Sequence, residues 1–114
     1  MVNRVIVGAH YGLRDWLAQR ITAVIMAAYT IIVGCVLLAG PPLNYAVWKE
    51  LFGRGWMRVA TLVFAASLAW HAWVGVRDII MDYVKPTGIR LSLEAAVAVT
   101  IAGYLAWAIQ ILWR

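Results

Sequence analysis

The chain has 114 residues, of which 65% are hydrophobic and only 13% are charged, and its net charge is +5. Soluble domains are about 45–50% apolar and about 25% charged, so this composition excludes an ordinary soluble domain. The basic residues border apolar runs and form no stripe with interleaved aromatic residues, which excludes nucleic acid as the expected partner. We therefore expect an integral protein of the lipid bilayer.

Three charge-free runs follow one another along the chain: Ile21–Ala39, Val59–Val76 and Ala95–Trp113. Each is 18 or 19 residues long, and a helix needs about 20 residues to cross the hydrocarbon core of a bilayer. The first run is too long for the apolar part of a signal peptide. The sequence therefore predicts an all-α membrane protein with one domain over residues 1–114. Its three transmembrane helices are expected at approximately residues 18–39, 58–83 and 91–113.

The loop after the first run begins with Gly40, Pro41 and Pro42, which stop the helix. Asn44 then stands where it can cap a short amphipathic segment in the membrane interface. The second and third runs are separated by Lys85-Pro86, and the residue before a proline is disfavoured in helical geometry. These breaks divide the chain into the three expected spans.

Basic residues are distributed unequally between the two sides of the predicted membrane. Six lie on the side of the N-terminus and the second loop, namely Arg4, Arg14, Arg20, Arg77, Lys85 and Arg90. Four lie on the other side, namely Lys49, Arg54, Arg58 and Arg114. The positive-inside rule then predicts a cytoplasmic N-terminus and a periplasmic C-terminus.

His71 is the only ionisable residue well inside a charge-free run, and such a residue is a functional hypothesis by default. At 100° of rotation per residue, the same helical stripe contains Ser67, Gly75, Asp78 and Asp82 if the helix continues past Arg77. Three interpretations remain open at this stage. The imidazole is a hydrogen-bonding bridge between helices, a proton-relay group, or an axial haem ligand. Three spans enclose little interior, and the other histidine, His10, reads as a surface residue, so a six-coordinate haem requires a second chain.

Three further residues lie near the predicted cytoplasmic side. Arg20 opens the first span, either as a boundary arginine that reaches toward water or as a guanidinium that pairs with a carboxylate such as a haem propionate. Tyr83 lies past the end of the second charge-free run, where an amphipathic ring is ordinary. Its functional interpretation is a phenol that hydrogen-bonds a quinone carbonyl, with Asp82 supporting it.

Two segments of the second predicted helix carry a family resemblance. The residues His71-Ala72-Trp73-Val74-Gly75, followed by Asp82-Tyr83-Val84-Lys85-Pro86, resemble the D-subunit membrane anchor of bacterial succinate dehydrogenase, respiratory complex II. The resemblance extends over essentially the whole chain, including the Arg14-Asp15 pair, Arg20, and the aromatic residues Tyr45 and Trp48. One departure is Arg14, because some relatives have a histidine at this position.

The resemblance implies a three-span protein in the bacterial cytoplasmic (inner) membrane, within a helical bundle shared with a second anchor, the C subunit. It implies that His71 is an axial ligand of haem b and binds the haem iron, and that Arg20 pairs with a haem propionate. Tyr83 would bind ubiquinone, the electron-accepting substrate, and Asp82 would support that site. The remaining partners would be the flavoprotein and iron–sulfur subunits, which hold the FAD and the iron–sulfur clusters. The alternatives are an anchor of a related quinone-linked fumarate reductase, or a structural or assembly membrane protein without a cofactor.

Overall fold

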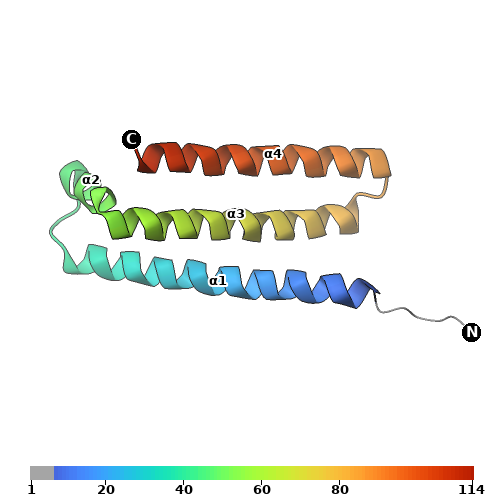
Figure 1. Cartoon of the computed structure of the whole chain (residues 1–114), viewed down its shortest axis with the longest axis horizontal. Coiled ribbons are helices and arrows are strands. Elements are labelled where there is room, and N and C mark those ends of the chain that lie inside the picture. The colour runs from blue at the N-terminus through green and yellow to red at the C-terminus, as the bar shows by residue number, and fades with distance from the viewer. Residues whose placement is uncertain (1–6) are drawn as a thin grey trace, which may run out of the picture.

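The computed structural model describes residues 7–114, and their side chains from Gly12 onward. Its helices are α1 (Val7–Ala39), α2 (Tyr45–Gly53), α3 (Gly55–Tyr83) and α4 (Thr87–Leu112). Figure 1 shows the three long helices side by side, with α3 between α1 and α4 and the short α2 at one end. All three are long and apolar enough to cross a membrane, which confirms the predicted all-α fold with three spans.

The helix ends follow from local chemistry. Asn44 caps α2, where its side chain accepts a hydrogen bond from the backbone N–H of Val47 at 3.0 Å, as the sequence predicted. Pro86 precedes α4, and its carbonyl accepts the N–H of Arg90 at 2.9 Å. The connection between α3 and α4 is only Val84–Pro86, so the two helices are antiparallel neighbours.

The long helices extend further than their charge-free runs. The described span of α1 begins at Gly12, α3 begins at Gly55, and α4 begins at Thr87. Charged residues at the membrane boundary are compatible with helical geometry, so the loss of apolar character marks the end of the hydrocarbon core and not the end of the helix. At 1.5 Å per residue, the 29 residues of α3 extend about 44 Å, which exceeds a hydrocarbon core of about 30 Å.

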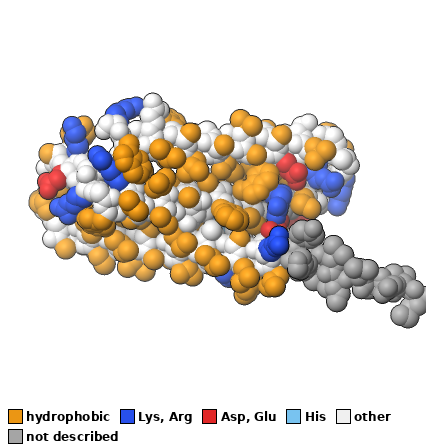
Figure 2. Space-filling model, viewed as in Figure 1, with side chains coloured by type: hydrophobic (Ala, Val, Ile, Leu, Met, Phe, Trp, Pro, Cys, Tyr) orange, Lys and Arg blue, Asp and Glu red, His pale blue; other side chains and the backbone are white. Residues whose placement is uncertain are grey.

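Figure 2 shows hydrophobic side chains over the middle of the molecule and charged side chains at its two ends. Few of the described side chains are buried: Thr22, Leu51, Met57, Ser67, Val74, Ile80 and Leu112. Three helices in a row leave most apolar side chains facing outward, and Leu38, for example, is 90% exposed. The chain by itself therefore requires a surrounding of lipid or of other apolar helices to cover these faces.

Candidate functional site

His71 lies on α3 at its interface with α1. Its imidazole Nδ1 is 3.0 Å from the hydroxyl oxygen of Thr22 on α1. Thr22 and Ser67, which is one turn before His71 on α3, are each only 7% exposed. They are the buried polar residues of the described chain, so the packed interior is most polar around His71.

The Thr22–His71 contact is the middle one of three polar contacts between α1 and α3. Asp15 forms an ion pair with Arg77, and the hydroxyl groups of Tyr29 and Thr61 are 2.7 Å apart. Residues 15, 22 and 29 recur every seven positions along α1, which keeps them on one face of the helix. The ring of Tyr29 also stacks on Phe64, with 4.4 Å between centroids. Polar contacts at three depths therefore fix the register of the two antiparallel helices.

The predicted stripe through His71 exists because α3 continues unbroken to Tyr83. One turn after His71, a Cβ atom added to Gly75 would lie 3.6 Å from the side-chain nitrogen Nε2 of Gln19 on α1. The stripe therefore faces α1 at this level. Asp78 and Asp82, further toward the end of α3, are exposed. Along its length the stripe therefore changes from small residues that are buried or half-buried to exposed acids.

Two buried polar atoms near this interface have no hydrogen-bond partner among the described residues: Oε1 of Gln19 and Nε of Arg77. Arg77 is the ion-pair partner of Asp15, and the backbone carbonyl of Gln19 contacts the Thr22 hydroxyl that meets His71. Buried polar atoms without partners are uncommon in folded proteins and call for an explanation such as a water molecule or a missing group. This end of the α1–α3 interface is thus the part of the described chain with unfilled hydrogen-bonding capacity.

Arg20 is exposed and lies on a different face of α1 from the His71 contact. It precedes Thr22 by two positions, which is a rotation of about 200° around the helix. Its guanidinium lies over the ring of Trp16, 5.1 Å from the centroid. Arg20 and Thr22 differ in depth by only about 3 Å along the axis of α1, so Arg20 lies at nearly the depth of His71. The chain alone nevertheless does not bring the side chains of Arg20 and His71 together.

Tyr83 is the last residue of α3 and is 80% exposed. Asp82 beside it is also exposed, and no hydrogen bond joins their side chains in the described structure. Tyr83 is twelve positions after His71, about 18 Å along the helix axis. The predicted haem and quinone residues therefore occupy separate positions on α3, one within the bundle and one at its end.

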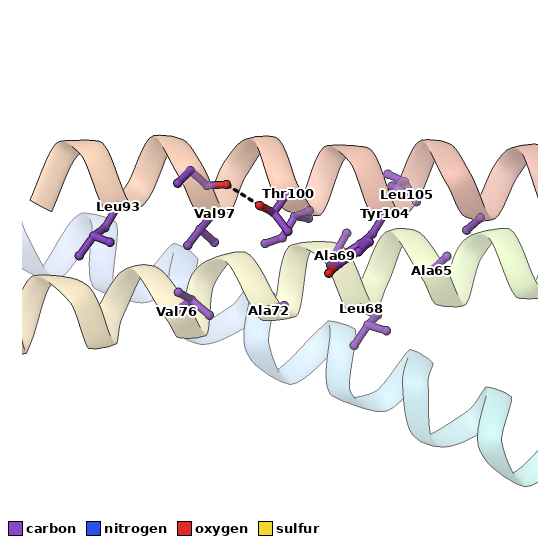
Figure 3. A pocket seen from close by; sticks show the side chains of 13 residues that line it. Ala65, Leu68, Ala69, Ala72, Val76, Leu93, Val97, Thr100, Tyr104 and Leu105 are labelled. Carbon is purple, nitrogen blue, oxygen red and sulfur yellow. Dashed lines mark hydrogen bonds between the residues drawn. The ribbon is translucent and has the colours of Figure 1, made fainter.

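A third feature is an apolar groove between α3 and α4, with a volume of about 560 Å³. Figure 3 shows it beside Ala65, Ala69 and Ala72, whose small side chains leave the space open. The hydroxyl of Thr100 in its wall donates to the Ala96 carbonyl at 2.8 Å. The groove suits a hydrocarbon chain or an apolar side chain, and it lies on the α4 side of α3, away from the His71–Thr22 contact.

A metal site made by this chain alone is not present in the described residues, which contain no group of three or more His, Cys, Asp or Glu side chains placed to hold an ion. His71 offers a single imidazole. One nitrogen ligand is what one of two chains contributes to a haem held between them. The donor set thus fits a shared haem and does not fit a self-contained metal centre.

Comparison with known proteins identifies the family. The family model for the succinate dehydrogenase/fumarate reductase transmembrane subunit matches residues 3–107. The chain is also 44% identical over 102 residues to the succinate dehydrogenase hydrophobic membrane anchor subunit of Coxiella burnetii (strain RSA 493 / Nine Mile phase I), and the match covers 90% of this chain and 89% of that relative. The chain belongs to the succinate dehydrogenase/fumarate reductase transmembrane subunit family. It is a membrane-anchor subunit of an oxidoreductase complex, and the predicted resemblance is confirmed.

His71, Arg20, Tyr83 and Asp82 all lie within the part of the anchor that matches the family model. Thr22, the contact of His71 on α1, was not among the residues predicted from the sequence. A threonine in a transmembrane helix is unremarkable because its hydroxyl is satisfied by a carbonyl of the preceding turn, so its residue type gave no signal. The ion pair between Asp15 of α1 and Arg77 of α3 was not predicted either, because a sequence does not show which charges of two helices meet.

Proposed function

We propose that this anchor subunit binds haem b and ubiquinone in a succinate:ubiquinone oxidoreductase of the bacterial cytoplasmic membrane. In this proposal a second anchor, the C subunit, supplies the other haem ligand, and the iron–sulfur and flavoprotein subunits dock on the cytoplasmic side. Electrons from succinate pass through FAD and iron–sulfur clusters in those partners to ubiquinone. The N-terminus is cytoplasmic and the C-terminus periplasmic.

The observation that carries the proposal is the setting of His71. Its imidazole lies among apolar helices, one nitrogen contacts Thr22, and the other remains for a ligand outside this chain. We assign His71 as an axial ligand of the haem iron. The haem supplies one-electron redox chemistry when bound, and Thr22 of α1 holds the imidazole of His71 on α3 in place.

Arg20 is proposed to pair with a haem propionate, because a guanidinium forms bidentate hydrogen bonds with a carboxylate. It lies at nearly the same depth as His71, and its exposed guanidinium is open to a partner. Because Arg20 lies on another face of α1 from Thr22, the pairing would form only in the assembled complex.

Tyr83 is proposed to donate a hydrogen bond to a carbonyl of ubiquinone, and Asp82 to support that site. Both side chains are exposed at the end of α3, where water supplies the protons that quinone reduction consumes. The exposure of Tyr83 leaves room for a quinone head group between this chain and a partner subunit.

The test is an absorption spectrum of the purified, reduced complex, which should show the sharp α-band of a bis-histidine b haem. The variant His71→Leu should lose most of its haem. His10→Gln, which removes the other histidine, should retain the native band. An intact, active wild-type complex without haem, or a His71→Leu complex with the native spectrum, would overturn the assignment.

A further inference from the structure

Thr22 contacts His71 from the neighbouring helix in a buried position. Thr22 is 7% exposed, and its Oγ1 is 3.0 Å from the imidazole Nδ1. This is a normal hydrogen-bond distance. Which of the two atoms donates decides which imidazole nitrogen carries the proton.

The other contacts of the Thr22 hydroxyl settle its role. Oγ1 is 2.6 Å from the carbonyl oxygen of Ala18 and 3.3 Å from that of Gln19. A hydroxyl has one proton, and a carbonyl oxygen can only accept. The short contact with Ala18 therefore takes the hydroxyl proton, which leaves a lone pair of Oγ1 directed at His71. The imidazole then carries its proton on Nδ1 and donates it to Thr22.

We propose that Thr22 is a positioning residue that holds His71 in the Nδ1–H tautomer and presents Nε2, with its lone pair, to the haem iron. This inference rests on the proposed haem ligation by His71. A neutral imidazole with its proton on the wrong nitrogen cannot ligate through Nε2, so tautomer and ring orientation are both requirements of the site. The positions of Ala18 and Thr22 on one turn of α1 meet both requirements.

The hydrogen bond also changes the ligand electronically. An imidazole that donates Nδ1–H to an acceptor is a more basic ligand through its other nitrogen. A more basic ligand favours ferric over ferrous haem and lowers the midpoint potential. Removing the acceptor should therefore raise the potential and weaken haem binding, even though Thr22 does not touch the haem iron.

The experiment compares Thr22→Val, which keeps the shape of the side chain and removes its oxygen, with Thr22→Ser, which keeps the oxygen. Thr30→Val is the matched control, because the Thr30 hydroxyl also donates to the carbonyl one turn earlier on α1, at 2.8 Å from Met26, and is exposed. Each whole complex is purified, and its haem affinity and haem midpoint potential are measured by spectroscopic titration.

Thr22→Val should bind haem about tenfold more weakly and show a raised midpoint potential, while Thr22→Ser and Thr30→Val match the wild type. If Thr22→Val does not assemble, Thr22→Cys replaces it, because a thiol is a weaker acceptor and should also raise the potential. Native potential and affinity in the assembled Val or Cys variant would overturn the inference, as would an equal change in Thr22→Ser. A wild-type complex that lacks haem would instead overturn the proposed function, so the two failures are distinct.

Discussion

Asp15 of α1 and Arg77 of α3 form an ion pair seven residues along α1 from the Thr22–His71 contact. Their side chains are 34% and 29% exposed, respectively, so the pair lies partly out of water. It holds the two helices together near the level where α3 leaves the apolar run. Any tilt of α3 against α1 at this end would also displace His71 from Thr22.

We predict that breaking this pair weakens the assembled complex. Asp15→Asn or Arg77→Gln should each cost about 1 kcal/mol, because one charge stays partly desolvated without its partner. The measurement is the fraction of intact complex after heating in detergent, and the double variant should lose less than the sum of the single ones. Arg54→Gln is the control, since its pair with Glu50 is exposed and 3.5 Å long and is expected to contribute little. Single variants as stable as Arg54→Gln would contradict the prediction.

The fold followed from the sequence because the bilayer imposes strong constraints. Runs of apolar residues of the right length, together with the breaks at Pro41 and Pro86, fix the number and order of helices. The Asn44 cap was also predictable, because a cap depends on residues three positions apart. The rotation of α3 placed Ser67 and Gly75 beside His71 by simple geometry.

The contacts across helices were not predictable in the same way. A stripe on α3 does not reveal which neighbouring helix it faces, and the pairing of Thr22 with His71 depends on the register of α1 against α3. For Arg20, a position was predicted that the rotation of the helix does not provide within this chain. Its place directly before the first charge-free run allowed a pairing with a haem propionate, but the rotation of α1 directs Arg20 to a different face from Thr22. In the proposed complex a partner chain would complete these surroundings, and its side chains are not encoded in this sequence.

The proposed topology predicts which loops meet the periplasm. In a Cys35→Ser background, Glu50→Cys and Arg114→Cys should react with a membrane-impermeant maleimide in intact spheroplasts, because both positions are exposed on the side opposite the N-terminus. Lys85→Cys, in the loop between α3 and α4, should react only after the membrane is opened. Labelling of Lys85→Cys in intact spheroplasts would reverse the orientation, and it would place the proposed quinone residues on the periplasmic side.

The quinone proposal predicts a selective defect in Tyr83→Phe. This change keeps the ring at the end of α3 and removes the phenol that would donate a hydrogen bond to a quinone carbonyl. The loss of one such bond in a half-wet site costs about 1–1.5 kcal/mol, or about tenfold in ubiquinone reductase kcat/KM. Succinate oxidation with an artificial dye and the haem content should stay at wild-type levels, because neither depends on this phenol.

Tyr104→Phe is the matched control for that variant. Tyr104 is also an exposed tyrosine, 65% accessible, but it lies on α4 in the apolar groove and away from the end of α3. Its loss should leave ubiquinone turnover unchanged. Asp82→Asn should lower ubiquinone turnover less than Tyr83→Phe does, since the carboxylate is proposed to act through the tyrosine or through nearby water. If Tyr83→Phe turns over ubiquinone like the wild type, the head group binds elsewhere, and the exposed ring of Tyr83 is an interfacial side chain of the kind that membrane helices commonly carry.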